Sequence, residues 1–293
     1  MVLSRWIDKR IKYVFVLPAL IFVLVMMVFP ILYTLRLSFS QWSMGSLTPP
    51  RWIGLRNFTS LLVQDRRFWP AVGRTFAFTI IAVVIETVLG VAIALILNRD
   101  MRGKNVIKTL FLLPMVATPV AVGMVWLLMY EPSIGVINYF LKLLGLPQGL
   151  WLASPAQALG SLILVDVWQW TPMITLIVLA GLAALPSEPY EAALVDGAST
   201  LQSIRLITLP LLQPTILAAM TLRAIDAFKT YDIIYTMTQG GPGYATETLN
   251  IYSFVLGFQY FQMGKASALL IIFFALTLGL AVMINWLKKP LEL

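Results

Sequence analysis

Long apolar runs constrain this chain more than any other feature of its sequence. Several of them reach roughly 20 residues or more with almost no charge, the length an α-helix needs to cross roughly 30 Å of hydrocarbon. The composition agrees, with 59% hydrophobic and 12% charged residues. We therefore predict an all-α polytopic membrane protein with six transmembrane helices. They are expected at 13–35, 72–97, 106–130, 156–182, 210–237 and 266–287.

The chain contains no histidine and no cysteine. This composition excludes zinc sites of the usual kind, thiol nucleophiles, histidine general bases and disulfides. We expect neither a catalytic residue nor a metal site. The net charge of +8 is compatible with nucleic-acid binding. Lysine and arginine at the ends of the apolar runs fit membrane topology better.

The basic residues predict which side of the membrane each loop occupies. The run at 13–35 is too long for a cleaved signal peptide and has no small-residue cleavage site after it, so we expect it to be retained. Six helices place both termini on one side, and a cytoplasmic position gives eleven basic residues inside against eight outside. The eleven are Arg5, Lys9, Arg10, Lys12, Arg99, Arg102, Lys104, Lys108, Arg205, Lys288 and Lys289.

The polar stretch 187–210 interrupts two apolar runs and has the pattern of helix, turn and helix. Ser187 is placed to cap the first helix, and Gly197 suits a left-handed residue at its end. Ser199 and Gln202 have capping-box spacing for the second helix. Pro210 then opens the next transmembrane run.

The side chains of this stretch favour docking to a protein over docking to lipid. Small residues at Ala192, Ala193 and Ala198 permit close approach, and acidic residues outnumber the one Arg205, whereas membrane-surface helices usually carry Lys or Arg. A packed intracellular turn remains an equal alternative on these residues alone. Apolar positions near helical spacing are Leu194, Leu201, Ile204 and Ile207.

Here the sequence resembles a known family. The order Glu191-Ala192-Ala193, Gly197, Ile207 and Leu209-Pro210 matches the EAA motif of permease subunits of bacterial ATP-binding-cassette importers. Segments such as "GLRNFTSLL", "PSIGVINYFLKLLGL", "FKTYDIIYTMTQGGPGYATETL" and "MGKASAL" resemble the carbohydrate-uptake branch, which includes maltose, glycerol-phosphate and polyol importers. The resemblance covers nearly the whole chain.

The resemblance implies a type I importer permease fold in one transmembrane domain over 1–293, with a cytoplasmic coupling loop at 187–210. It implies a bacterial inner-membrane location and alternating access. The implied partners are a second permease subunit, a homodimeric cytoplasmic ATPase and a periplasmic solute-binding protein. No GxxxxGK[ST] sequence is present, so ATP and Mg²⁺ are expected on the ATPase and not on this chain. The residues implied to couple to the ATPase are Glu191, Ala192, Ala193, Gly197, Ile207, Leu209 and Pro210.

Charged residues inside the apolar runs are the candidates for function. Each costs at least about 2.5–3.5 kcal/mol at bilayer depth, so each is expected to face a partner or a cavity. Those in the run 210–237 are Arg223, Asp226, Lys229 and Asp232. We expect positions 223, 226, 227, 230 and 234 to share one helical face, and Lys229 to pair with Asp232 three residues on.

The resemblance also implies a substrate path along the helices on either side of the coupling loop. Matching positions in this chain are Asp166, Gln169, Trp170, Met173, Arg223, Ala227 and Thr230. Trp168 and Trp170 flank Gln169 and supply the flat faces and N–H donors that sugar sites use. Trp168 alone is also compatible with packing.

Two hypotheses for Arg223 stay open. Its guanidinium is suited to an anionic group on the substrate, such as a phosphate, sulfonate or carboxylate. Alternatively it forms an ion pair with Asp166 or Asp226, and the site takes a neutral sugar or polyol.

Two other function classes compete with an importer subunit. A secondary transporter would use Glu86 and Asp166 as ion carriers, but no inverted repeat is apparent in the sequence. A membrane-embedded enzyme would depend on a close Asp or Glu pair, and no such spacing stands out.

Overall fold

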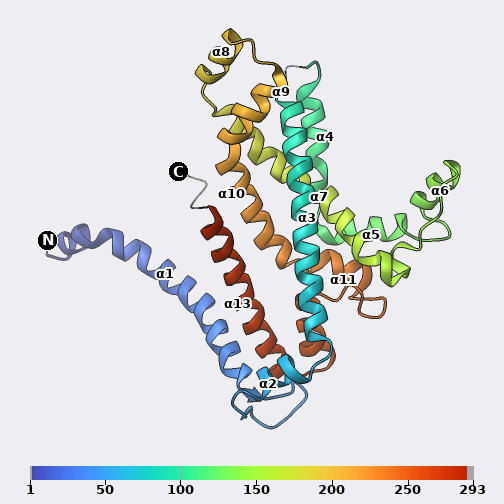
Figure 1. The fold of residues 1–293 in the computed structure, drawn as a ribbon. Helices are drawn as coiled ribbons and strands as arrows, with labels where there is room; N and C mark the ends of the chain where they lie inside the picture. Colours follow the sequence, from blue (N-terminus) through green and yellow to red (C-terminus); the bar gives the residue numbers. More distant parts are fainter. Residues whose placement is uncertain (1, 100, 289–293) are drawn as a thin grey trace. The chain divides into compact units, whose positions relative to one another are not determined.

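The computed structural model describes residues 2–99 and 101–288. Among the described residues the regular secondary structure is helical apart from one antiparallel pair of two-residue strands, which confirms the predicted fold class. The elements are α1 Val2–Ser38, β1 Ser40–Gln41, β2 Arg51–Trp52, α2 Arg56–Thr59, η1 Ser60–Gln64, α3 Phe68–Leu97, α4 Lys104–Val116, α5 Pro119–Met129, α6 Val136–Leu143, η2 Trp151–Ala153, α7 Pro155–Ala183, α8 Glu188–Val195, α9 Thr200–Ser203, η3 Ile204–Thr208, α10 Leu209–Phe228, α11 Asp232–Thr238, α12 Leu249–Phe254, η4 Val255–Gln259 and α13 Met263–Lys288 (Figure 1).

The chain divides into two compact units. The first comprises 1–66 and 253–273, and the second comprises 67–252 and 274–293. Within the described residues, five helices are long and apolar enough to cross a membrane, and a bent pair makes a sixth candidate. The five spans are Phe15–Ser38, Phe68–Leu97, Pro155–Ala183, Thr200–Phe228 and Met263–Trp286.

Three helices of the second unit, α3, α7 and α10, form its apolar core. Buried residues such as Ala94, Ile174 and Leu212 pack together. Gly90 lets α3 approach α7 closely, because a Cβ at this position would lie 2.8 Å from Ile174 Cγ2. Polar residues on these helices are satisfied locally, as where the Thr175 hydroxyl donates to the Thr171 carbonyl at 3.0 Å. Small side chains and internal hydrogen bonding suit helices that pack inside a membrane.

The helix predicted at 106–130 is broken in the structure. It divides into α4 and α5, which are bent by 95° to each other. Ala117 and Thr118 between them are extended, with ψ of 144° and 140°. Pro119 disfavours a helical residue before it and provides a good first residue for α5. A single straight helix was therefore the wrong prediction, and the proline was the signal.

The helix predicted at 210–237 also ends early. α10 stops at Phe228 and α11 starts at Asp232. The amide of Asn250 donates to the carbonyl of Lys229 at 2.7 Å and satisfies one acceptor at the broken end. Positions 230 and 234 therefore do not continue the helical face of Arg223, and Lys229 and Asp232 do not share a helix.

The coupling loop has the predicted helix–turn–helix form. Gly197 is left-handed with φ of 73°, and the next amide, that of Ala198, donates to the Ala193 carbonyl at 2.9 Å. The capping box of Ser199 and Gln202 is present. Ser187 stands at the start of α8, but its side chain makes no capping hydrogen bond, so that part of the prediction was wrong. α9 continues through η3 into α10 as one span from Thr200 to Phe228.

The first unit contains α1, the strand pair and the start of α13. The Asn57 amide donates to the carbonyls of Ser38 and Ser40, both at 2.9 Å, and ties α2 to the end of α1. Lys265 pairs with Asp65 at 2.6 Å. These contacts give Asn57 a structural role in the fold.

Candidate functional site

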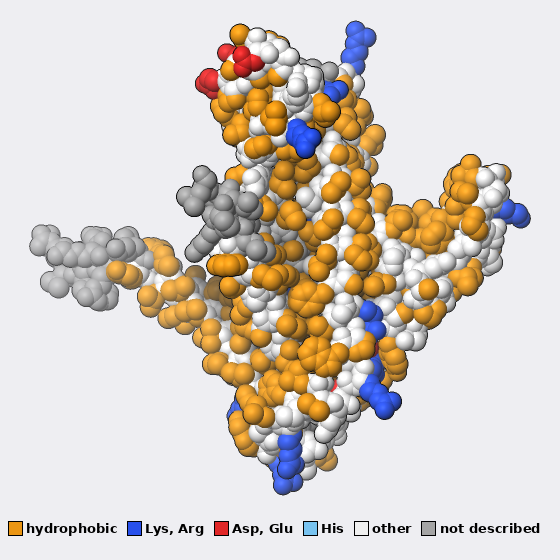
Figure 2. Space-filling model, in the orientation of Figure 1, with side chains coloured by type: hydrophobic (Ala, Val, Ile, Leu, Met, Phe, Trp, Pro, Cys, Tyr) orange, Lys and Arg blue, Asp and Glu red, His pale blue; other side chains and the backbone are white. Residues whose placement is uncertain are grey.

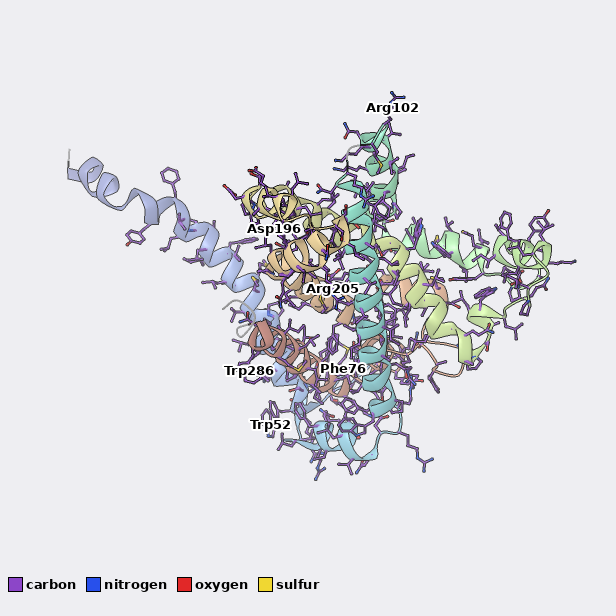
Figure 3. All side chains as sticks on the ribbon, turned by 45° about the horizontal axis from the view of Figure 1, so that its top comes forward. Trp52, Phe76, Arg102, Asp196, Arg205 and Trp286 are labelled. Atoms are coloured by element: carbon purple, nitrogen blue, oxygen red, sulfur yellow. The ribbon has the colours of Figure 1, made fainter. Side chains whose placement is uncertain are left out.

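The coupling loop forms one end of the second unit, together with the turn between α3 and α4 (Figure 1). Figure 3 shows Asp196 and Arg205 on the loop and Arg102 at the tip of that turn. The Tyr190 hydroxyl donates to the Thr208 hydroxyl oxygen at 3.0 Å and links α8 to η3. The basic turn and the coupling loop therefore lie at the same end of the unit.

The loop leaves large apolar side chains in solvent. Leu194, Val195, Leu201 and Leu206 are 79%, 87%, 75% and 70% exposed. Acidic side chains gather over the same end in Figure 2, where α8 carries Glu188 and Glu191 and is followed by Asp196. Exposed apolar residues beside charges are typical of a surface that another protein covers.

The seven predicted coupling residues differ in exposure. Glu191, Ala192, Gly197 and Pro210 are exposed, Ile207 and Leu209 are half-buried, and Ala193 is buried. Of the four apolar positions at helical spacing, Leu194 and Leu201 are exposed. Ile204, like Ile207, is half-buried. Val195 and Leu206, which the sequence pattern did not single out, extend this surface.

An ion cluster around the buried Arg223 joins α3, α7 and α10 in the second unit. Arg223 on α10 is 0% exposed. Its Nε lies 2.7 Å from Glu86 Oε2 on α3, and its Nη2 pairs with Asp166 on α7. Asp226, which is exposed, lies 3.7 Å from Nη1. A buried charge needs such partners, because leaving it unpaired is strongly unfavourable.

The cluster contains the ion pair that one of the two hypotheses for Arg223 expects. In this structure its guanidinium is bound by the carboxylates of Glu86 and Asp166. The pair with Asp166 was foreseen, whereas Glu86 was missed as a partner. The signal was present, because a carboxylate inside an apolar run requires a cation from a neighbouring helix.

A pocket of about 280 Å³ lies beside the cluster. It brings together four of the seven predicted substrate residues, Asp166, Gln169, Trp170 and Thr230. Arg223, Met173 and Ala227 are not among its lining residues; Ala227 packs in an apolar cluster with Val83 and Ala224. The remaining lining residues are Pro119, Asp226, Lys229, Tyr231, Asp232 and Ile233.

The two broken helices build this pocket. Pro119 begins α5 after the first break, and Lys229, Thr230 and Tyr231 form the second break. The amide nitrogen of Gln169 donates to the Ala117 carbonyl at 3.2 Å, so it satisfies an acceptor that the first break exposes. Irregular backbone at membrane depth is tolerated where it lines a cavity.

The tryptophans of α7 have different surroundings. The Trp170 ring lies in the pocket wall, with the Arg223 guanidinium carbon 5.3 Å from the ring centroid. Trp168 packs edge-on against Trp126 with a centroid distance of 5.5 Å. Packing is therefore the role of Trp168 in this structure.

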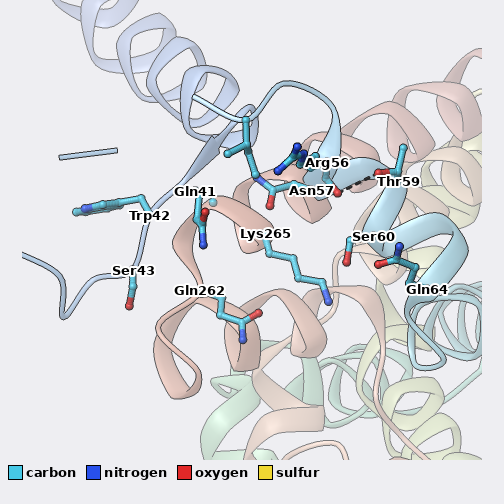
Figure 4. A pocket seen from close by; sticks show the side chains of 12 residues that line it. Gln41, Trp42, Ser43, Arg56, Asn57, Thr59, Ser60, Gln64, Gln262 and Lys265 are labelled. Carbon is cyan, nitrogen blue, oxygen red and sulfur yellow. Dashed lines mark hydrogen bonds between the residues drawn. The ribbon is translucent and has the colours of Figure 1, made fainter. Parts of the chain in front are cut away.

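A larger pocket of about 630 Å³ lies in the first unit (Figure 4). Its wall is mixed, with the polar side chains Gln41, Asn57, Gln64 and Gln262 beside apolar ones such as Trp42 and Ile53. Lys265, which is paired with Asp65, also lines it. None of the predicted substrate residues belongs to this pocket.

Sequence alignments with named relatives cover almost the whole chain. It is 37% identical to the trehalose/maltose transport system permease protein MalF of Thermococcus litoralis, over 95% of this chain and 93% of that protein. It is 33% identical to the sulfoquinovosyl glycerol transport system permease protein SmoG of Agrobacterium fabrum, over 94% and 90%. It is 32% identical to the trehalose transport system permease protein SugA of Mycobacterium tuberculosis, over 92% and 86%.

Solved structures show the same fold. A chain of a bacterial ABC transporter that imports the acidic polysaccharide alginate superposes with a TM-score of 0.85 at 23% identity, over 99% of both chains. Residues 86–291 match the family described as "Binding-protein-dependent transport system inner membrane component". The chain therefore belongs to the family of inner membrane components of binding-protein-dependent transport systems.

Proposed function

We propose that this chain is the transmembrane permease subunit of an ATP-driven importer, and that it moves a sugar or sugar derivative from the periplasm to the cytoplasm by alternating access. The pocket between α5, α7 and α11 is the proposed substrate site. Its wall combines an indole face with amide, hydroxyl and carboxyl groups, which is the mixture that a saccharide needs. The relatives that handle trehalose, maltose and sulfoquinovosyl glycerol support this substrate class.

Both termini are proposed to lie in the cytoplasm of a bacterial cell. The basic turn 98–104 shares one end of the second unit with the coupling loop. Short basic loops stay in the cytoplasm during membrane insertion, so this end is the inner one. The basic N-terminal tail agrees with that orientation.

The energy is proposed to come from a separate cytoplasmic ATPase, which binds ATP and Mg²⁺ as a homodimer. The exposed apolar residues Leu194, Val195 and Leu201 enter a groove on it, with Glu191 as a charged contact at the edge. Gly197 keeps α8 and α9 at the angle that this docking requires. Closure of the ATPase then moves α10 directly, because α9 is continuous with it.

Two further partners complete the proposed importer. A second permease subunit forms the other half of the transmembrane pathway, and a periplasmic solute-binding protein delivers the substrate. The family description and the alginate transporter solved with its periplasmic protein support this composition.

The exposed apolar surface of the coupling loop is the single observation that carries the proposal, since the sequence contains no GxxxxGK[ST] motif. Co-expression with the ATPase, second permease and binding protein, followed by reconstitution into liposomes, tests it. We expect vanadate-sensitive ATP hydrolysis that the loaded binding protein stimulates, and saccharide uptake that stops without ATP. Uptake that persists without ATP and collapses with an uncoupler would instead establish ion-coupled transport, which the pairing of Glu86 and Asp166 with Arg223 disfavours.

A further inference from the structure

The pocket of the first unit has two walls that backbone contacts hold together. The amide of Met44 donates to the Phe261 carbonyl at 3.1 Å. The amide of Gly264 donates to the Trp42 carbonyl at 3.2 Å. A Cβ at Gly264 would collide with the Ser40 carbonyl oxygen, so glycine permits this close approach. The segment after β1 and the start of α13 are therefore fixed against each other.

The third wall of this pocket is α2 with η1. The Asn57 amide ties α2 to β1 through the Ser40 carbonyl, and Asp65, which follows η1, pairs with Lys265 on α13. The pocket is thus preorganised. Its volume of about 630 Å³ falls within the roughly 300–1,000 Å³ of small-molecule sites.

Three accessible primary amides line the pocket (Figure 4). Gln41, Gln64 and Gln262 are exposed, and their side chains form no hydrogen bond with another described residue. Each amide offers donors and an acceptor, which is what sugar hydroxyl groups require. The half-buried Trp42 adds an indole ring, and aromatic faces pack against the C–H groups of sugar rings. This mixture favours a saccharide over an apolar ligand.

The charge of the pocket wall is positive. Arg56 is exposed and forms no ion pair with another described residue. Lys265 is engaged by Asp65, and none of the described residues that line the pocket is acidic. One guanidinium therefore remains to bind an anionic group, and its geometry matches a carboxylate or sulfonate bidentately.

We propose that this pocket is a second saccharide site, separate from the pocket between α5, α7 and α11, and that it binds acidic sugars through Arg56. The amides of Gln41, Gln64 and Gln262 bind the sugar hydroxyl groups, and Trp42 packs against the ring. The pocket lies next to the end of α1 and the start of α13, which is the outer side of the membrane in the proposed orientation. The inference rests on the proposed function for that orientation alone.

Protection of a single cysteine from labelling tests the inference in the intact importer complex. Ser43→Cys places a thiol in the pocket of a chain that has no natural cysteine, and the rate of its labelling by a maleimide is measured on this chain. The probes are glucuronate and galacturonate, with glucose and galactose as neutral counterparts and acetate as an anion without a sugar ring, all at one ionic strength. We expect the acidic sugars to slow labelling at about fivefold lower concentrations than their neutral counterparts, and acetate to have little effect.

Variants in the Ser43→Cys background assign the preference to the pocket. Arg56→Gln should remove it, because glutamine keeps hydrogen-bonding groups but not the charge. Arg51→Gln is the matched control, since Arg51 on β2 is exposed in the same unit, lies outside the pocket and should leave the preference unchanged. Gln262→Ala should raise the protecting concentrations of acidic and neutral sugars alike. Leu47→Cys, which is exposed outside the pocket, should label at one rate with and without sugar.

A cysteine in the other pocket separates this inference from the proposed function. Protection of Thr230→Cys without protection of Ser43→Cys overturns the outer site and leaves the permease function standing. Protection at neither position overturns the outer site and also removes these sugars from the proposed substrate pocket. Equal protection of Ser43→Cys by acidic and neutral sugars, or a preference that Arg56→Gln does not change, overturns the role assigned to Arg56. Acetate that protects as well as the acidic sugars overturns the saccharide assignment.

Discussion

Arg223 is the buried cation that pairs with carboxylates of two other helices inside the second unit. Its guanidinium joins α10 to Glu86 on α3 and to Asp166 on α7. Removing one partner from a buried ion group costs about 3–5 kcal/mol, because the remaining charge stays buried and unpaired. The cluster therefore fixes how three core helices meet.

Arg223→Met should strongly destabilise the complex, by about 3–5 kcal/mol from the two carboxylates it leaves unpaired. Thermal unfolding of the purified complex, followed by size-exclusion chromatography, measures this loss. The triple variant Arg223→Met/Glu86→Gln/Asp166→Asn carries no unpaired charge and should recover much of it. A stable Arg223→Met complex that only loses saccharide uptake would instead place Arg223 in direct contact with substrate.

At the scale of elements, the contact between α3 and α7 depends on a glycine. A Cβ at Gly90 meets Ile174 Cγ2 at 2.8 Å and the backbone nitrogen of Thr175 at 3.3 Å. Gly73, on the same helix, has nothing within 4 Å of the corresponding position. Alanine substitutions at the two glycines therefore separate the effect of close packing on stability from the effect of helix propensity.

Gly90→Ala should lower the free energy of unfolding by about 1–3 kcal/mol, the usual cost of overpacking. Gly73→Ala should be neutral or stabilising, by up to about 1 kcal/mol from helix propensity. Thermal midpoints of the two variants in the same detergent give the comparison. If both shift equally, close packing at Gly90 is not what holds α3 to α7.

The coupling loop makes a second prediction at this scale. Leu201→Ser and Val195→Ser remove exposed apolar side chains, so the fold should be unaffected while assembly with the ATPase weakens. We expect at least about a tenfold loss of stimulated ATP hydrolysis with normal expression of the permease. Leu47→Ser, at a fully exposed leucine of the first unit, is the control. Full ATPase stimulation in both loop variants would remove these residues from the interface.

The sequence predicted most of the fold, because transmembrane length and capping chemistry are local. Four of the six spans, the left-handed Gly197 and the capping box of Ser199 were correct. The break at Ala117–Thr118 had a local signal in Pro119 that a long apolar run obscured. The break after Phe228 had none, since the Lys229 carbonyl at the broken end is satisfied by Asn250, more than twenty residues further along the chain.

The residues of the proposed substrate pocket were predicted less completely than the fold. The residues near Gln169 came from resemblance, and the structure gathers four of them round one pocket. It places Arg223 behind that pocket, because Glu86 binds it from α3. The sequence shows both charges but does not show which helices adjoin.

At the scale of the whole molecule, we propose a transmembrane pathway that a separate subunit drives. The natural absence of cysteine makes every single-cysteine variant site-specific without further engineering. Thr200→Cys on the coupling loop should be labelled by a membrane-impermeant maleimide only after the cells are opened, and Leu47→Cys in intact spheroplasts. The reverse labelling pattern would show that the chain has the opposite orientation in the membrane.

The most direct test of the central claim is a crosslink from the coupling loop in the intact importer. A photoreactive amino acid replaces Leu201, the complex is illuminated in its own membrane, and the crosslinked product is identified by mass spectrometry. We predict a crosslink to a separate ATPase subunit. Crosslinks confined to this chain, or to a periplasmic protein, would contradict it.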